Sequence, residues 1–301
     1  MTDVILALDA GGTKTKVAAI DNDKRVVFET VGNVGSPAVD LSKAVSHIFD
    51  LVITSLDQIK NRYCVKHIYI GMSGFSIIPN VTQLEEEMNE AFGISVTLLS
   101  DTKMALYSFI KDKTEEGILM ISGTGSACYG QKGNKELLVG GWGHLLGESG
   151  SSYSSVRRLL LDAIKQYDLG KPYTDLQMKI MQKMQVKDAN GFRIYVYHKS
   201  KKEVAALAPI ISDAAANQNK EAIEILRETA REIVWHIVTV YERLGLSNQA
   251  YLGFCGSFIH RATQVKKMVI EELLKNGCKL HVVEEEEDPI FGAYYLHKRS
   301  I

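Results

Sequence analysis

Two short segments of the sequence share one pattern, and this repetition limits the possible folds more than any other feature. The segment "LALDAGGTKTK" (6–16) runs from apolar residues into a Gly-Gly-Thr turn and back into a strand-like stretch. The segment "ISGTGSACYG" (121–130) does the same roughly 110 residues later. Apolar runs on both sides of a Gly-rich turn are typical of β-hairpins. We therefore expect two related units, each containing a strand, a turn and a second strand.

The two turns have the chemistry of phosphate sites. Neither is a Walker P-loop, because both lack GxxxxGK[ST]. The second is a poor dinucleotide fingerprint, since Cys128 stands where the third glycine of GxGxxG belongs and a strand-like stretch follows. Residues 11–13 and 123–125 can still bind phosphate, because glycines let backbone amides approach an anion and threonine adds a donor. The competing interpretation is a tight hairpin that needs its glycines only for positive φ.

The rest of the pattern predicts an α/β protein. Apolar residues at helical spacing predict helices at 41–59 and 81–93, the second stopped by Gly93, and the longest helix at 219–245. A polar break, "KDKTEEG", precedes the second unit, which is mostly helical after its hairpin. The first unit is expected to be a layered α/β domain, because its helices alternate with strand-like apolar runs. These runs lie at 4–10, 16–21, 25–32, 67–74 and 95–101.

Composition excludes several function classes. Thirty-five basic side chains balance 36 acidic ones, giving a net charge of -1, so no nucleic-acid or membrane-surface partner is indicated. The four cysteines fit no zinc spacing and are interpreted as buried thiols in a reducing compartment. The N-terminus lacks the features of a signal peptide, and no apolar run approaches the about 20 residues that span a bilayer. We expect a cytoplasmic protein.

Two aspartates near strand ends are candidates for chemistry. Asp9 precedes the first turn and could hold Mg²⁺ through water, or simply cap the turn. Asp101 follows a strand and begins a predicted helix. Its structural role would be a helix N-cap, and its catalytic role would be a general base. The two roles are compatible, because a helix N-terminus stabilises an anion.

A Gly-rich loop and an acidic run stand apart from the regular pattern. The loop "GGWGHLLGESGSSYS" suits a sugar, since Trp142 could stack on a pyranose ring and Glu148 could accept hydroxyl protons. The alternative is an ordinary loop with Trp142 packed inward. The acidic run at 284–287 is interpreted as the approach to a helix, with Asp288 as its N-cap and Pro289 at the first helical position.

Taken in order, "LDAGGTKTK", "MSG", "SDTKMA", "ISGTGSAC", "GGWGHLLGESGSSY" and "CGSF" resemble the BadF/BadG/BcrA/BcrD-type ATPases, and within them the N-acetylglucosamine kinases. The resemblance covers nearly the whole chain. It implies the actin/hexokinase-type fold, with two ribonuclease-H-like lobes around a cleft and a second lobe enlarged by helices. The implied lobes are 1–114 with 288–301, and 115–287. The resemblance also implies ATP and Mg²⁺ as cofactors, a small-molecule sugar as substrate, and a homodimer.

Position by position, the resemblance implies a set of site residues. Asp101 would be the catalytic base and a substrate contact, and Asp9 the Mg²⁺ residue. ATP and its phosphates would contact Gly11, Gly12, Thr13, Lys14, Gly123, Thr124, Gly125, Gly256 and Ser257. The sugar would contact Ser36, Ser126, Ala127, Gly141, Trp142, Gly143 and Glu148.

The chain departs from the family pattern at three sugar positions. Ala127 and Ser36 stand where asparagines are usual, with Asn33 near the second position, and Glu148 replaces an aspartate. The resemblance therefore implies phosphorylation, at O6, of an N-acetylated hexosamine such as N-acetylglucosamine or N-acetylmuramic acid. The alternatives are another hexose or hexosamine kinase, an ATPase that activates a partner enzyme, and a sugar sensor without activity. The role of segment 171–204 is left open.

Overall fold

The computed structural model describes residues 1–300 and divides the chain into two compact units. The first unit comprises Met1–Glu115 and the chain from Glu284 onward, and the second comprises Glu116–Val283. The predicted boundaries lie one and four residues away from these, so the acidic run at 284–287 falls in the first unit.

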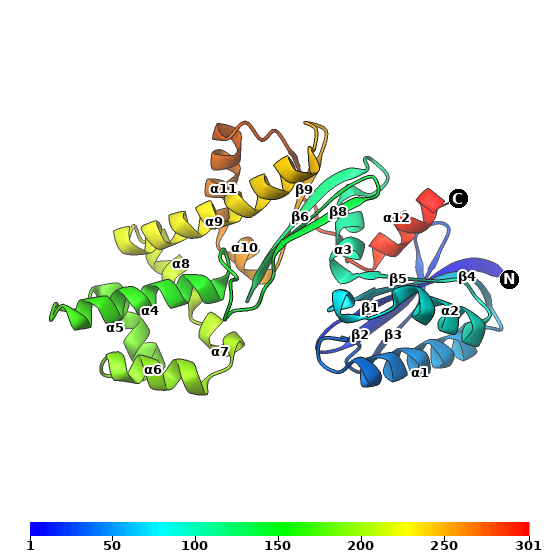
Figure 1. The fold of residues 1–301 in the computed structure, drawn as a ribbon, viewed down its shortest axis with the longest axis horizontal. Coiled ribbons are helices and arrows are strands. Elements are labelled where there is room, and N and C mark those ends of the chain that lie inside the picture. Colours follow the sequence, from blue (N-terminus) through cyan, green and yellow to red (C-terminus); the bar gives the residue numbers. More distant parts are fainter. Residues whose placement is uncertain (301) are drawn as a thin grey trace. The chain divides into compact units, whose positions relative to one another are not determined.

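The first unit is a five-stranded mixed sheet with helices on both faces (Figure 1). The strand order is β3-β2-β1-β4-β5; β1 is antiparallel to β2 and parallel to β4. Its strands are β1 (Thr2–Ala10), β2 (Thr15–Asp21), β3 (Val26–Gly32), β4 (Tyr63–Met72) and β5 (Val96–Ser100). Its helices are α1 (Leu41–Ile59), the 3-10 turn η1 (Phe75–Ile77), α2 (Val81–Phe92), α3 (Asp101–Ile110) and α12 (Phe291–Ser300).

Alternation along β1 sends side chains into two separate cores. Leu6 and Leu8 pack with residues of α1 and α2 on one face of the sheet. Ile5 and Ala7 pack on the other face with Met104 of α3, with Ile290 just before α12 and with Ala293 in its first turn. Both faces are therefore covered, as expected for strands that are apolar on both sides.

The second unit repeats the topology of the first sheet. Its strand order, β10-β9-β6-β7-β8, mirrors the first one, with β6 antiparallel to β7 and parallel to β9. The duplication expected from the two turns is thus present in the sheets themselves. The strands are β6 (Glu116–Ser122), β7 (Ser126–Lys132), β8 (Lys135–Gly140), β9 (Tyr251–Cys255) and β10 (His281–Val282).

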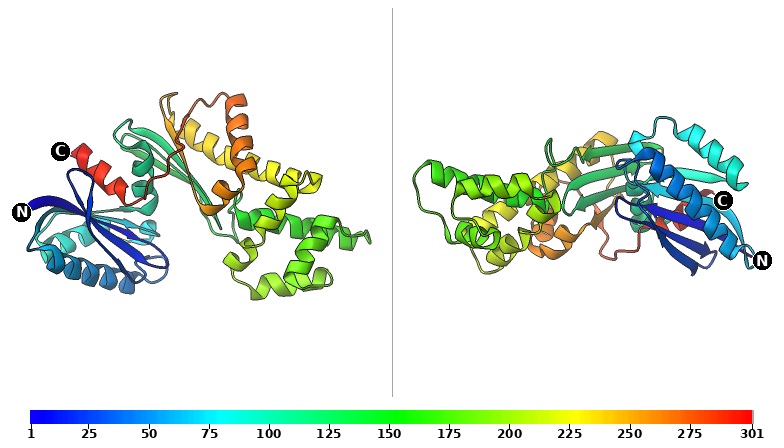
Figure 2. Two further views of the ribbon diagram at one scale, coloured as in Figure 1. Left: turned by 180° about the vertical axis from the view of Figure 1, so that it is seen from behind. Right: turned by 90° about the horizontal axis from the view of Figure 1, so that it is seen from below.

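Helices dominate the remainder of the second unit (Figures 1 and 2). The long helix α9 packs on β6, β7 and β8, and one continuous apolar core joins the sheet to the helices. The helices are α4 (Ser152–Asp168), α5 (Asp175–Met184), α6 (Ala189–His198), α7 (Lys201–Ala205), α8 (Ala208–Ala216), α9 (Lys220–Leu244), α10 (Ser257–Arg261) and α11 (Thr263–Lys275).

Local sequence signals explain several boundaries. Asp40 caps α1 by accepting a hydrogen bond from the Lys43 amide, and Asn219 caps α9 through the Ala222 amide. Gly93 and Gly245 end α2 and α9 in the left-handed region, at φ 63° and 60°. The predicted ranges of α1 and α2 are confirmed.

The prediction for the start of the last helix is wrong by two residues. Helix α12 begins at Phe291, so Pro289 is not its first residue and Asp288 is not its N-cap. Asp288 closes the preceding turn instead, accepting a hydrogen bond from the Ile290 amide at 3.1 Å. Its carboxylate also pairs with Lys16 at 2.8 Å, while Glu287 pairs with Lys24. These two acids thus pair with Lys16 of β2 and with Lys24 in the turn between β2 and β3.

Candidate active site

The first Gly-rich turn joins β1 to β2 and presents an open tip. The Gly11 amide donates to the Lys14 carbonyl at 3.0 Å, which closes the turn. Gly12, Thr13 and Lys14 are exposed, and a Cβ placed on Gly12 would have no neighbour within 4 Å. The amide and hydroxyl groups at this tip are therefore accessible to an anion.

The base of this turn is held rigidly. The Ser73 amide, just after β4, donates to the Ala10 carbonyl at 3.0 Å, and the Thr15 hydroxyl donates to the Asn33 carbonyl at 2.8 Å. Gly35 packs so tightly here that a Cβ would lie 2.4 Å from Thr15 Oγ1. The turn thus stands on a fixed support, as a phosphate site requires.

Asp9 and Asp101 meet at the same edge of the first sheet. Strands β1, β4 and β5 are parallel, so their carboxyl ends lie together, and these ends carry Asp9, Ser73 and Asp101. Burial raises the pKa of Asp9 to about 6, with further contributions from the charges of Asp101 and Asp288. Burial also raises the pKa of Asp101, partly opposed by hydrogen bonds from Thr102 and Ser73.

The structure corrects the local role assigned to Asp101. The N-cap of α3 is Ser100, whose hydroxyl accepts from the Lys103 amide at 3.1 Å. Asp101 is the first residue of the helix, and its Oδ1 accepts a hydrogen bond from the Thr102 amide at 2.7 Å. The first turn of α3 therefore fixes the Asp101 carboxylate, while Ser100 caps the helix.

A cavity of about 520 Å³ opens beside the first turn. Lys16 lies in its wall, bound to Asp288 at 2.8 Å and to Glu29 at 3.0 Å. The cavity is lined by Asp9, Gly11, Thr13, Lys14, Lys16, Glu286, Glu287, Asp288 and Pro289. Asp9, in this wall, has its pKa raised by burial and then by the charges of Asp101 and Asp288.

Asp9 fits the role of a Mg²⁺ anchor through water. Its raised pKa reflects burial first and then the charges of Asp101 and Asp288, and a divalent cation nearby would favour its ionised form. Within residues 1–300, no group of three or more His, Cys, Asp and Glu side chains is arranged to hold a metal ion. A Mg²⁺ ion at Asp9 would keep several of its waters and take few protein ligands.

The second Gly-rich turn joins β6 to β7 and contacts the turn after β9. The Gly123 amide donates to the Gly125 carbonyl at 2.9 Å, and both the amide and the hydroxyl of Ser152 donate to the Gly123 carbonyl at 2.9 Å. Gly256 has φ 108°, and a Cβ there would lie 2.6 Å from the Ser122 carbonyl oxygen. Only glycine allows these two turns to lie side by side.

Next to the paired turns is a cavity of about 460 Å³. Thr124 and Ser257, both predicted from the sequence, line it together with residues that were not predicted. Its wall is mostly of small or apolar side chains with two cations, Lys202 and Arg261, which suits a nucleotide. The lining residues are Thr124, Ser152, Lys202, Ala205, Ala206, Ala208, Pro209, Ser212, Asp213, Ser257, Phe258 and Arg261.

The Gly-rich loop after β8 exposes its tryptophan. Trp142 is 72% exposed, so the alternative that it packs inward is wrong. Gly141 and Gly143 flank it with φ values of 75° and 86°, which favour glycine. Glu148 behaves differently, because its side chain is 11% exposed and forms an ion pair with Lys201 of α7.

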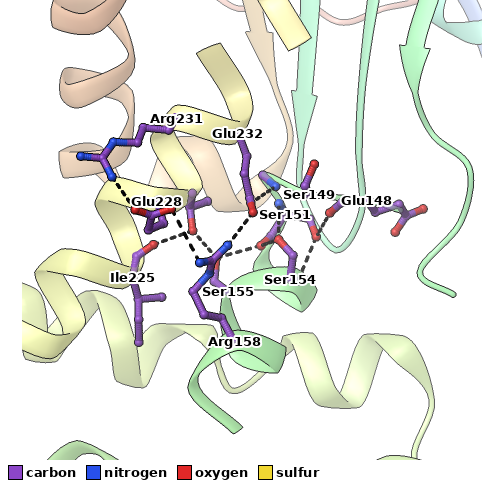
Figure 3. A network of polar contacts seen from close by, with 12 residues as sticks. Glu148, Ser149, Ser151, Ser154, Ser155, Arg158, Ile225, Glu228, Arg231 and Glu232 are labelled. Carbon is purple, nitrogen blue, oxygen red and sulfur yellow. Dashed lines mark hydrogen bonds and ion pairs between the residues drawn. The ribbon is translucent and has the colours of Figure 1, made fainter. Parts of the chain in front are cut away.

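A polar network fastens the end of this loop to the helices (Figure 3). Glu232 of α9 accepts from the Gly150 amide at 2.8 Å and from Arg158 of α4 at 2.7 Å. The Ser151 hydroxyl donates to the Glu148 carbonyl at 2.8 Å while also capping α4. The backbone carrying Glu148 is therefore fixed even though the loop tip is exposed.

Three predicted sugar contacts lie where their side chains serve the fold. The Ser36 hydroxyl is buried and donates to the Ser73 carbonyl at 2.7 Å, whereas the nearby Asn33 is exposed. The Ser126 hydroxyl is also buried and donates to the Ser149 carbonyl at 2.6 Å. Ala127 is half-buried, and a Cβ on Gly141 would lie 3.3 Å from its own Cβ.

Comparison with known proteins places the chain in a family. The profile of the BadF/BadG/BcrA/BcrD ATPase family matches residues 6–296, and the chain belongs to this family. It is 28% identical to an N-acetylmuramic acid/N-acetylglucosamine kinase of Clostridium acetobutylicum, over 97% of each chain. It is 27% identical to an N-acetyl-D-glucosamine kinase of Dictyostelium discoideum, over 99% of this chain and 98% of the relative.

Solved structures show the same fold at lower identity. A protein of Porphyromonas gingivalis proposed to be an N-acetylglucosamine kinase superposes with a TM-score of 0.69 at 21% identity, covering 99% and 100% of the two chains. A ROK hexokinase of Thermus thermophilus gives 0.59 at 15% identity, covering 98% and 99%. The predicted sugar-kinase and actin-like fold is confirmed. Among the described residues, no helix is both long and apolar enough to cross a bilayer.

Proposed function

We propose that this ATPase-family protein is an ATP-dependent sugar kinase that transfers the γ-phosphate to O6 of an N-acetylated hexosamine. N-acetylglucosamine and N-acetylmuramic acid are the two proposed acceptors. The names of the relatives in Clostridium acetobutylicum and Dictyostelium discoideum support the reaction class. The observation that carries the proposal is Asp101, a carboxylate held at a strand end beside Asp9 and the first Gly-rich turn.

Asp101 is the proposed general base. Burial raises its pKa, so its carboxylate takes a proton more readily than an exposed aspartate does. The hydrogen bond from the Thr102 amide and the position in the first turn of a helix oppose this increase, because both favour the ionised form that a general base needs. In this role it orients the sugar hydroxyl and accepts its proton as the new O–P bond forms, while the bond from the γ-phosphorus to the β–γ bridging oxygen breaks and ADP leaves.

The turns are the proposed phosphate ligands. Residues 11–13 and 123–125 would each bind phosphate oxygens of ATP through backbone amides and the Thr13 and Thr124 hydroxyls. The cavity bounded by Thr124, Ser257 and Arg261 would take the nucleoside. When bound near Asp9, Mg²⁺ would neutralise charge on the β- and γ-phosphates.

The Gly-rich loop is the proposed sugar side of the site. Trp142 is free to stack on a sugar ring, and Glu148 would accept a sugar hydroxyl. Ala127 ends at its Cβ, so it would leave room that the carboxamide of an asparagine would take up. This room is the reason to include N-acetylmuramic acid, which carries a lactyl group at O3, among the proposed acceptors.

The alternative of an ATPase that activates a partner enzyme through an iron–sulfur cluster has less support. Such a cluster needs accessible thiolates. Cys128 is completely buried in β7, and burial strongly raises the pKa of its thiol. Cys278 is buried as well. The expectation of buried thiols is wrong for Cys64 and Cys255, which are only half-buried, but the four cysteines have no cluster-like spacing in the sequence.

A coupled assay that measures ADP formation tests the proposal. Glucose, glucosamine, N-acetylglucosamine, N-acetylmannosamine and N-acetylmuramic acid are compared as acceptors, with phosphate position assigned by NMR. We expect sugar-dependent ADP formation with the N-acetylated sugars. Asp101→Asn should lower kcat by about a hundredfold or more while ATP still binds. Near-normal turnover by this variant would remove Asp101 from its role, and ADP formation independent of any sugar would contradict the kinase.

A further inference from the structure

Lys201 places a cation directly on the second Gly-rich turn. Its ammonium group is ion-paired with Glu148, and the two side chains are 26% and 11% exposed. A Cβ added to Gly125 would lie 2.6 Å from Lys201 Nζ and 2.5 Å from Glu148 Oε2. The ion pair therefore fills the space that a side chain at position 125 would need, which explains the glycine there.

Helix α7 is built to begin at this point. Ser200 and Glu203 form a capping box that fixes its first turn, and Val204 and Ala205 are buried against the core. The next residue, Lys202, lines the cavity that Thr124 also borders. Two consecutive lysines thus reach two sides of the same turn, one beside Glu148 and the other beside the cavity.

The ammonium group of Lys201 has more N–H donors than its ion pair with Glu148 uses. A lysine carries three N–H donors, and a single carboxylate oxygen accepts one of them. The remaining donors can bind oxygens of a phosphate seated on residues 123–125. Glu148 also keeps the ammonium at the turn, since leaving a mostly buried carboxylate without its partner is unfavourable.

We propose that Lys201 is a ligand of the terminal phosphate of a bound nucleoside triphosphate, and that Glu148 holds it there. The proposal rests on the assignment of residues 123–125 as a phosphate turn within the proposed function. Lys201 lies on the side of the turn that carries Glu148, the proposed sugar residue, so the phosphate it meets is the one to be transferred. Lys201 thereby distinguishes a nucleoside triphosphate from a diphosphate. It also neutralises negative charge on the phosphoryl group while that group is transferred.

A purely structural role would have a different signature. If Lys201 only ties the Gly-rich loop to α7, its loss would alter the loop and the sugar KM while leaving the preference between nucleotides unchanged. The discriminating quantity is therefore the ratio of the dissociation constants for ADP and for a non-hydrolysable ATP analogue.

Calorimetry on the full chain with Mg²⁺ and no sugar measures this ratio. Lys201→Met should weaken binding of the imido analogue of ATP about tenfold or more, and binding of ADP by less than about twofold. Lys201→Arg should restore most of the loss. Lys199→Met is the matched control, because it removes a lysine from the same segment whose partner is Glu203, at 2.9 Å on the surface.

Equal weakening of both nucleotides, no weakening of either, or an effect confined to the sugar KM would overturn the proposal. Thermal unfolding of each variant monitors folding, and Lys201→Gln replaces the methionine variant if that one fails to fold. The assay contains no sugar, so the two proposals fail separately. A wild-type protein that discriminates nucleotides through Lys201 but phosphorylates no sugar refutes only the kinase. An active kinase with an unchanged ratio refutes only the role of Lys201.

Discussion

Replacing Asp9 by asparagine is expected to stabilise the first unit at neutral pH. The pKa of Asp9 rises from 3.8 to about 6 in the folded protein because of burial and then the charges of Asp101 and Asp288. At pH values between these two pKa values, the Asp9 carboxyl is protonated more often in the folded chain than in the unfolded chain. The stability linked to this proton is therefore complete below pH 3.8 and is lost as the pH rises through about 6. At about 1.4 kcal/mol per unit, the loss reaches about 3 kcal/mol, and asparagine avoids it.

Urea unfolding at pH 5 and pH 8 measures this effect. The advantage of Asp9→Asn over the wild type should grow by about 1.4 kcal/mol between these pH values, since the wild-type carboxyl is still partly protonated at the lower one. Hydrogen exchange of the β1 amides reports the stability of the first unit. Both tryptophans, Trp142 and Trp235, lie in the second unit, so their fluorescence provides an internal control.

Asp50→Asn, on the exposed side of α1, is the matched control, because it makes the same substitution at a surface position of the same unit. A constant difference between Asp9→Asn and the wild type, or a variant less stable than the wild type at pH 8, would refute the reasoning. The variant should also lose Mg²⁺-dependent ATP binding. Its stability and its function would then change in opposite directions, as is common for functional carboxylates.

Three further outcomes follow from the structure. Thr124→Ala should raise the KM for ATP more than that for the sugar in steady-state kinetics, and an effect on the sugar alone would contradict its phosphate role. Gly292→Ala should destabilise the chain by about 2–4 kcal/mol, since a Cβ would lie 1.8 Å from the Met104 carbonyl oxygen; an unchanged Tm would argue against this close packing. Burial raises the pKa of Asp101 above 3.8, so kcat/KM should fall on the acid side with a midpoint above that value. A midpoint at or below it would exclude Asp101 as the titrating base.

Periodicity and caps predicted most of the regular structure, because these signals are local. The apolar spacing in α1 and the Gly93 stop of α2 correspond directly to observed boundaries. Along α9, Ile225 and Val240 are buried, while Ile223 is half-buried. The sequence pattern did not predict β8, whose residues are mostly exposed or half-buried and so lack a strong apolar run.

Errors occurred where two neighbouring residues compete for one role. Ser100 and Asp101 can both cap α3, and the serine does so because the aspartate is the first residue within the helix. Asp288 has the sequence context of an N-cap, but its Oδ1 closes the turn before α12 through the Ile290 amide and its Oδ2 binds Lys16 of β2. A single sequence offers no means of weighing a local hydrogen bond against a partner so distant along the chain.

The candidate site was predictable only where its residues lie in motifs. The two Gly-rich turns and Glu148 were identified, whereas Lys201, Lys202 and Arg261 were not. These basic residues lie in helices α7 and α10 with no surrounding motif, and only the fold of the second unit brings them to the turn. The capping signal "SKKE" at 200–203 could have placed the start of α7, but not its contact with Glu148.

The position of α12 determines the order in which the chain can complete its units during synthesis. The second unit is continuous, so its core can close as soon as Val283 has left the ribosome. The first unit starts earlier but must wait, because Ile290 and Ala293 cover the face of its sheet formed by Ile5 and Ala7. The half of the protein that is made first is therefore finished last. A chain that stops before α12 would leave an apolar sheet face uncovered and available to chaperones or to aggregation.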